Sequence, residues 1–327
     1  MLFLRSRRAK TAADGGRAND APGAAQLGEL TAAAVYANSF IAIDRSLPST
    51  GVRASARRGD ALAGNAPEPA VGDAFLVNTR LRRNDRDTGE SIAEYFNDVA
   101  SVMLGLHGRR RCHGADLPLP HGTSMRLALS EALARRRSVR SYTGDAATVG
   151  DLAAILVAAS GVTGEQDVPL SDSRSVPLRF RAVASAGGLY PIDLLFVAIN
   201  VDGLGRGIYR YEPLRHALSG SGDADDVAAL LECFAGPQSA IALDRACGIL
   251  LLIGQPWRSV RKYGQRGMRF VFLEAGAIAH SVALAATALG YGSVDCASVY
   301  DDEVHEVLGL DGVDMTLLHA VVVGCPA

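Results

Sequence analysis

The apolar positions of this chain recur with a helical period in several segments. Over Glu90–Leu106 and Asp223–Phe234 the large apolar residues fall three or four positions apart, which predicts amphipathic helices. A shorter stretch of the same kind lies at Leu127–Leu133. Phe270–Leu289 is nearly all apolar and rich in alanine. We therefore expect it to form a long core helix with close neighbours on several sides.

Polar residues and glycines indicate where further helices begin and end. Thr148 and Asp151 form a start that resembles a capping box, and the apolar residues that follow share one helical face. Gly161 and Gly164 are expected to end this helix. The acidic run at Asp301 indicates another helix N-terminus, where negative charge is favourable.

Short apolar runs between these helices predict strands. Asp193–Asn200 and Ile249–Ile253 have the composition of buried strands, and Thr316–Val323 is predicted to be the last strand. Gly207–Glu212 alternates apolar and polar residues, and Ala217-Leu218 is expected to pair back against it. Hairpin-like strands that alternate with solitary long helices favour an α+β fold with an antiparallel or mixed sheet.

The first 110 residues differ from the rest in composition. They are rich in Ala, Gly and Arg, and we expect about the first 25 to be disordered. A short helix is predicted over Thr31–Ile43, and the basic run Arg80–Arg86 is interpreted as a solvated face, with an acidic peptide partner as the alternative. Prolines and glycines between Arg109 and Gly122 break the pattern. We therefore predict an N-terminal region at 1–110, of unknown role, and a folded domain at 111–327.

Composition and charge argue against several classes of function and partner, which the hypotheses for this chain leave out. The chain has 327 residues, 48% of them hydrophobic, and a net charge of -2, which gives no reason to expect a nucleic acid or an anionic membrane as partner. No signal peptide or membrane-spanning segment is expected. Five dispersed cysteines have no metal-binding spacing, nor do the histidines, which favours reduced thiols in a cytoplasmic protein and no metal site.

The run Arg136-Arg137-Ser138-Val139-Arg140 concentrates positive charge and a hydroxyl group. Guanidinium groups bind phosphate in a bidentate way, and a serine hydroxyl can add a hydrogen bond to a phosphate or a ring carbonyl. Such a run taken alone is more often a solvated helix end. The motifs that follow it along the chain reverse that preference.

Three further motifs carry potential chemistry. Ser185-Ala186-Gly187-Gly188 is predicted to be a turn whose glycines let the backbone approach a flat ring closely. Gly290-Tyr291-Gly292-Ser293 is either a second glycine-lined wall or a plain helix stop. Lys262-Tyr263 offers an amine and a phenol, although such a dipeptide is usually a surface feature. Each of these motifs is weak evidence alone, and their order along the chain is more specific.

In that order, over roughly residues 127–323, the motifs resemble those of the FMN-dependent nitroreductase superfamily. Within it, the chain is similar to the SagB-type (thiazole/oxazole-forming) peptide dehydrogenases. The sequence departs from the family pattern at Ala277, His280 and Ser281, and it has no arginine after the last predicted strand. Phosphate binding is therefore expected to rest on the first arginine run.

The resemblance implies a nitroreductase-like fold, with a mainly antiparallel mixed sheet flanked by helices around a long core helix, and an intertwined homodimer. It assigns the FMN site to the arginine-serine run and the two glycine motifs. The implied FMN ligands are Arg136, Arg137, Ser138, Arg140, Ser185, Ala186, Gly187, Gly188, Gly290, Gly292 and Ser293.

The resemblance also makes Lys262 and Tyr263 the catalytic pair. Oxidation of an azoline ring removes a proton and a hydride from neighbouring carbons, so the protein must supply a base. A lysine can serve only if burial or nearby cations lower its pKa. We expect Arg258, Arg261 and Arg266 to contribute if they lie close in space. His280 and Tyr190 are the alternative bases.

The leading hypothesis is an FMN-dependent dehydrogenase that oxidises thiazolines or oxazolines in a ribosomally made peptide, with oxygen re-oxidising the flavin. A cyclodehydratase complex is a possible partner. One alternative is an NAD(P)H-dependent nitro- or quinone reductase of the same fold. Another is a scaffold subunit that binds FMN for structure and docks the cyclodehydratase.

Overall fold

The computed structural model describes residues 71–80, 116–169, 175–236 and 239–327. The chain divides into two units, Met1–Leu47 and Pro48–Ala327, and every described residue belongs to the second. The disordered start and the helices expected over Thr31–Ile43 and Glu90–Leu106 therefore lie outside the described residues. So does most of the basic run that begins at Arg80.

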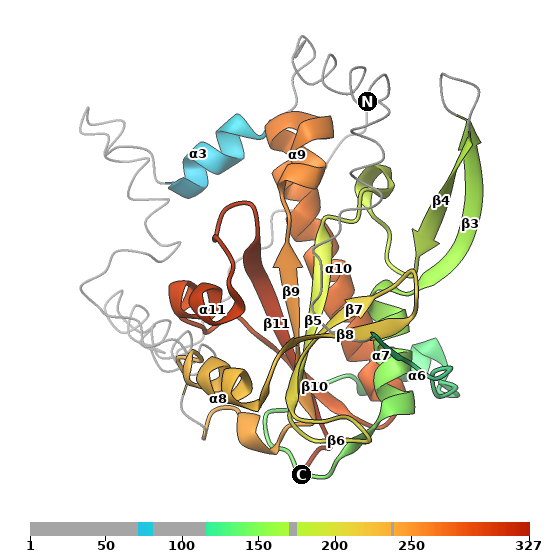
Figure 1. Cartoon of the computed structure of the whole chain (residues 1–327), viewed down its shortest axis with the longest axis vertical. Coiled ribbons are helices and arrows are strands. Elements are labelled where there is room, and N and C mark those ends of the chain that lie inside the picture. The colour runs from blue at the N-terminus through green and yellow to red at the C-terminus, as the bar shows by residue number, and fades with distance from the viewer. Residues whose placement is uncertain (1–70, 81–115, 170–174, 237–238) are drawn as a thin grey trace, which may run out of the picture. The chain divides into compact units, whose positions relative to one another are not determined.

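A seven-stranded antiparallel sheet forms the centre of the fold (Figure 1). From one edge to the other its strands are β1 (Asp116–Pro118), β8 (Ala217–Gly222), β7 (Gly207–Glu212), β5 (Ile192–Ala198), β9 (Gly248–Gly254), β11 (Thr316–Gly324) and β10 (Gly292–Cys296). The five segments predicted as strands are confirmed, including the return of the chain at residue 217. The α+β class and the antiparallel sheet are confirmed as well.

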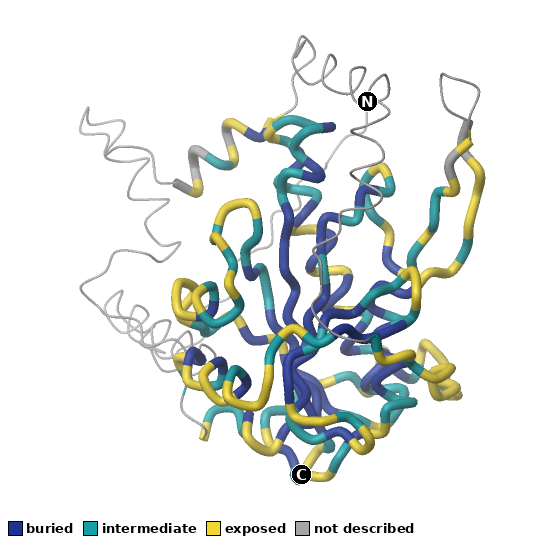
Figure 2. The backbone as a smooth tube through the Cα atoms, viewed as in Figure 1, coloured by how far each residue is buried: buried dark blue, intermediate teal, exposed yellow. Residues whose placement is uncertain are grey.

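Helices cover both faces of the sheet, which explains why the central strands are apolar throughout. On β5, Leu194 and Phe196 pack under α7 (Val149–Ser160) and α10 (Gly267–Ala288). Their neighbours Leu195 and Val197 face the opposite layer, formed by α8 (Ala224–Glu232) and α11 (Asp301–Leu308). Every residue of β9 is buried, as Figure 2 shows for the middle of the sheet. A strand covered on both faces has no polar side to show.

The helix boundaries follow the expected capping chemistry. The Thr148 hydroxyl accepts the backbone N–H of Asp151 at 3.1 Å, so α7 begins where predicted. The Gly161 N–H bonds to the Val157 carbonyl at 2.8 Å and ends it. Gly164 has no part in this stop, contrary to the prediction, because it already lies in the following strand.

The long core helix is confirmed as α10, which packs against the sheet, α7, α9 (Trp257–Tyr263) and α6 (Leu129–Arg135). Phe272 and Leu273 nevertheless remain 49% and 69% exposed on it. By length and composition the stretch Trp257–Ala288 could cross a membrane, a test that the core helix of a soluble protein also passes. Half of an apolar 18-residue segment within that stretch is buried inside the fold.

Several short elements were not predicted. The hairpin of β3 (Val162–Pro169) and β4 (Ser175–Arg181) forms its own two-stranded sheet, and Figure 1 shows it extending away from the main sheet. Its exposed residues are largely polar, so the sequence shows no alternation there. The remaining elements are α3 (Val71–Asn78), β2 (Ala147–Thr148), β6 (Val201–Asp202) and the 3-10 turns η1 (Ala186–Gly188), η2 (Leu243–Arg245) and η3 (Gly264–Arg266).

Candidate functional site

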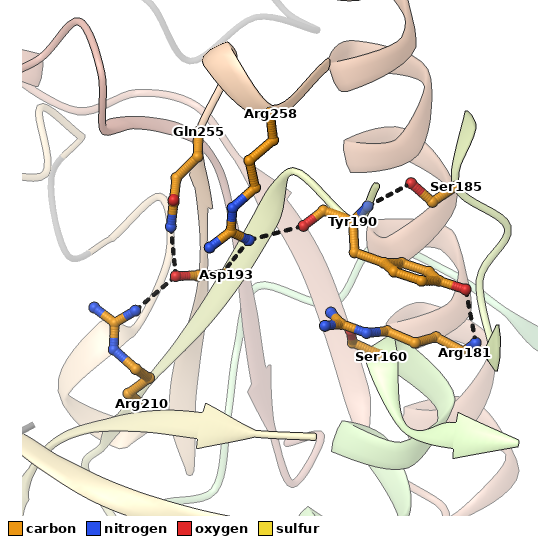
Figure 3. Close-up of polar contacts among 8 residues, drawn as sticks. All are labelled: Ser160, Arg181, Ser185, Tyr190, Asp193, Arg210, Gln255 and Arg258. Atoms are coloured by element: carbon orange, nitrogen blue, oxygen red, sulfur yellow. Dashed lines mark hydrogen bonds and ion pairs between the residues drawn. The ribbon is translucent and has the colours of Figure 1, made fainter. Parts of the chain in front are cut away.

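The predicted glycine turn, residues 185–190, is held in an unusual backbone conformation. Gly187 and Gly188 have φ values of 64° and 66°, and Tyr190 has a φ of 45°, which is rare for a residue with a side chain. The Tyr190 N–H donates to the Ser185 hydroxyl at 2.9 Å, so one side chain ties the two ends of the turn together. The Arg181 guanidinium lies 4.3 Å from the centre of the Tyr190 ring (Figure 3).

A buried ionic network fixes this turn to the sheet and to α9. The Asp193 carboxylate accepts hydrogen bonds from Arg210 and Gln255, both at 2.6 Å, and from Arg258 at 3.2 Å (Figure 3). The same nitrogen of Arg258 donates to the Tyr190 carbonyl at 3.0 Å. Because Arg258 lies one helical turn before Lys262, the network also sets the position of the predicted catalytic pair.

Lys262 and Tyr263 converge on the glycine turn. A Cβ atom at Gly187 would lie 2.5 Å from the Tyr263 hydroxyl and 2.7 Å from Lys262 Nζ. Real Cβ atoms do not come this close to other atoms. The structure therefore brings the predicted catalytic pair and the predicted glycine turn together, and a larger residue at 187 would have to displace the ends of both side chains.

Burial gives Lys262 the property that a base needs. Its side chain is 5% exposed, and this desolvation lowers the pKa of its amine. Burial, and not the expected repulsion from neighbouring arginines, is the cause of the shift. Arg258 is directed at Asp193, and Arg266 donates to the Thr79 carbonyl beside α3 at 3.2 Å.

The two alternative bases are placed less favourably. His280 is exposed on α10. The Tyr190 hydroxyl already accepts the backbone N–H of Arg181 at 3.0 Å, and its ring lies against that guanidinium. Among the described residues no group of three His, Cys, Asp or Glu side chains could hold a metal ion.

Glu274 is a site residue to which the sequence gave no role. It lies on α10, is 5% exposed and hydrogen-bonds to the Ser185 side chain. Burial raises the pKa of its carboxyl to about 7, although Ser185 and two nearby arginines oppose that rise. The available signal was a single acid within the long apolar run of residues 270–289.

The arginine run and the second glycine motif form the other half of the candidate site. The Val139 N–H donates to the Ser293 carbonyl at 2.9 Å, and Ser138 forms a parallel bridge with the same residue. A Cβ atom at Gly292 would lie 2.6 Å from Val139 Cβ, so glycine is needed for this approach. Arg137 donates to two backbone carbonyls, those of Ala134 and Arg136.

The two halves lie toward opposite ends of α10. Glu274, which contacts the first glycine turn, is 14 residues before Ala288, the last residue of the helix. At about 1.5 Å per residue this distance is about 21 Å. The second glycine motif follows that C-terminal end. The four predicted motifs thus meet as two pairs and not as a single cluster within one chain.

Residues 133–325 match the nitroreductase family. The chain belongs to this family. A protein of Methanocaldococcus jannaschii with a provisional nitroreductase name is 35% identical over 192 residues, which cover 59% of this chain and 89% of that relative. Nitroreductases are oxidoreductases, so membership makes this chain an oxidoreductase of the same fold.

Two solved structures share the fold at low identity. One, from Ralstonia eutropha, carries a provisional nitroreductase name, with a TM-score of 0.51 and 21% identity over 67% of this chain and 94% of its own. The other is a chain of the E. coli microcin synthetase McbBCD complex with truncated pro-MccB17 bound. It has a TM-score of 0.51 and 18% identity over 79% of this chain and 92% of its own.

Members of the nitroreductase family typically bind FMN, and the residues present here fit that group. Gly290 is exposed, and a Cβ atom there would meet nothing within 4 Å, so its backbone can be approached from outside. Beside the second glycine motif, Arg137 is exposed and Arg136 half-buried, and Arg136 also acts on the Asp295 carboxylate of β10. The arginine run would hold the phosphate, and the glycine motifs would border the ring.

Proposed function

We propose that this protein is an FMN-dependent dehydrogenase that oxidises thiazolines or oxazolines to azoles in a ribosomally synthesised peptide. The observation that carries the proposal is the convergence of Lys262 and Tyr263 on Gly187. A buried lysine whose pKa is lowered suits the removal of a proton from carbon. The shared fold with a chain of the microcin synthetase complex, which has truncated pro-MccB17 bound, also supports a peptide substrate.

Two residues of this chain can take up the proton that the azoline ring loses. An azoline loses a proton from one ring carbon and a hydride from its neighbour, and the hydride is the part that bound FMN takes up. The neutral amine of Lys262 accepts the proton, because burial disfavours its charged form. The Tyr263 hydroxyl, on the same side of Gly187, orients the ring or passes the proton on.

The separation of the two half-sites favours a composite site in a homodimer. The arginine run of one subunit would hold the FMN phosphate, and the glycine turn of its partner would bring Lys262 and Tyr263 to the ring. α6 and α10, which pack together, leave a set of large apolar side chains exposed. These side chains are Leu129 (66% exposed), Leu133 (51%), Phe272 (49%) and Leu273 (69%). A second copy of the chain would cover them.

The proposal extends to the protein's setting. We infer a cytoplasmic enzyme that acts on peptide already cyclised by a cyclodehydratase, with which it forms a complex. Neither nucleic acid nor membrane is a proposed partner. The catalytic domain is assigned to residues 111–327, and α3 of the N-terminal region contacts it, since Arg269 donates to the Leu76 carbonyl at 2.9 Å.

The deciding experiment compares two substrates. Purified wild-type protein is incubated with a pre-cyclised azoline peptide under air, and separately with NADPH and a quinone. A loss of two daltons per ring, without NADPH consumption, supports the proposal. NADPH-dependent quinone or nitro reduction with no action on azolines supports the alternative that the relatives' names suggest. Azole formation that persists in Lys262→Ala would instead indicate a scaffold role beside another catalyst.

A further inference from the structure

Glu274 is a buried acid, and one of its two carboxyl oxygens forms no hydrogen bond within the described residues. Its side chain is 5% exposed, and Oε2 has no hydrogen-bond partner among the described residues. Burying a carboxyl group costs free energy that packing alone does not return, and an apolar residue would fill the same volume more favourably. Its contact with the glycine turn gives a reason for its presence.

The Ser185 hydroxyl determines the direction of that contact. Its oxygen already accepts the Tyr190 N–H at 2.9 Å. The Ser185 hydroxyl donates to the Glu274 carboxylate, because this contact lowers the pKa of Glu274, as a hydrogen bond to the ionised form does. The chain Glu274–Ser185–Tyr190 therefore ties both ends of the turn to α10. Tyr190, at a φ of 45°, is in a conformation that persists only under such outside restraint.

The charges around Glu274 support an acceptor role. Arg181 from β4 and Arg258 from α9 both act on its carboxyl and stabilise the ionised form. Arg258 is shared with Asp193, which also pairs with Arg210. A carboxylate here offsets part of the positive charge of Arg181 and Arg258 while it accepts a hydrogen bond from the Ser185 hydroxyl.

We propose that Glu274 is a positioning residue: through Ser185 it fixes the glycine turn so that Gly187 lies against Lys262 and Tyr263. The inference rests on the proposed function for its catalytic readout, but not for its effect on the bound flavin. An acceptor at position 274, and not a carboxylate as such, is what the turn requires.

The test is a double-mutant cycle on FMN-loaded protein with Glu274→Ala, Ser185→Ala and the double variant. Each single change should lower kcat by about 10- to 100-fold, the usual worth of a hydrogen bond to a charged group, with KM little changed. The double variant should be no slower than either single variant, because both break the same chain. The visible circular dichroism of the flavin should change equally in all three.

Glu274→Gln is the rescue variant, because its amide oxygen still accepts the Ser185 proton; it should keep kcat within about threefold of wild type. Ser219→Ala is the matched control: it removes a serine-to-carboxylate bond to Asp116 at the sheet edge and should leave the flavin spectrum and kcat unchanged. Additive losses, or a Glu274→Ala protein with wild-type spectrum and kcat, would overturn the inference. Failure of azoline turnover in wild-type protein would count against the proposed function alone, since the flavin spectra would still report on Glu274.

Discussion

Gly187 and Lys262 approach so closely that a Cβ atom on the glycine would lie 2.7 Å from the lysine Nζ. Gly187→Ala should therefore displace the amine and lower azoline oxidation by about 100-fold, the effect of an ångström-scale misplacement. The φ of 64° adds strain to the turn. Gly220→Ala is the control, since a Cβ there meets nothing within 4 Å. Equal rates for the two variants would show that the contact does not matter for catalysis.

Removal of the proposed base should abolish turnover without loss of the cofactor. Lys262→Ala should keep its FMN and lose about 100- to 10,000-fold in kcat, the usual contribution of a positioned base. Lys262→Arg should fail as well, because a guanidinium group stays charged at any usable pH. Tyr263→Phe separates the roles of the hydroxyl: a small loss indicates orientation, and a loss as large as that of Lys262→Ala indicates a proton relay. Near-normal rates in both Lys262→Ala and Tyr263→Phe would place the base elsewhere.

The pH dependence of kcat should follow the ionisation of Lys262. Burial lowers the pKa of this amine, and only the neutral form accepts a proton. Activity should therefore rise as the pH increases through the lowered pKa and level off above it. Because Glu274 titrates at about 7, the profile should be repeated with Glu274→Gln. A rising limb that disappears in this variant would assign the ionisation to Glu274 and not to Lys262.

Purified protein should be yellow and release FMN, not FAD, on denaturation. Arg140→Ala should weaken FMN binding by about 10- to 150-fold, because a charge-assisted bond to phosphate is worth about 1.5–3 kcal/mol. Arg135→Ala is a suitable control, since Arg135 pairs with Glu131 on the exposed side of α6. Chromatography of the released flavin and a fluorescence titration measure both effects. Unchanged affinity in Arg140→Ala would remove this residue from the site.

A composite site allows complementation between two inactive proteins. Arg140→Ala and Lys262→Ala subunits, mixed and re-associated, should recover about a quarter of wild-type activity, since half the dimers are mixed and one of their two sites is intact. If each site lay within one chain, every site would keep one defect and no activity would return. Light scattering must show a dimer before and after mixing; a flavin-loaded monomer would contradict the arrangement.

Periodicity predicted the elements that have a buried face. β5 and β9 could be recognised because both of their faces are covered, and α10 because its apolar run is long. The β3–β4 hairpin was missed because it forms a separate two-stranded sheet whose exposed residues are largely polar, so no apolar alternation marks it. α9 was missed because it is only seven residues long and its buried residues include Arg258 and Lys262.

The sequence predicted the motifs of the candidate site, but it did not predict which motifs contact one another in space. Glycines at 187 and 292 signalled close approach, and both are needed for contacts with specific side chains. Which side chains these are depends on long-range packing that a single sequence does not encode locally. The role of Glu274 was missed for the same reason, because its partner Ser185 lies on another element.

The network around Asp193 has a consequence for how this sequence can change over time. Loss of Asp193 alone would remove the carboxylate that pairs with the buried guanidinium groups of Arg210 and Arg258, at a cost of about 3–5 kcal/mol. That is a large part of the stability of most domains. Viable descendants must therefore exchange these positions together, and the two arginines and the aspartate should be inherited as one co-varying unit.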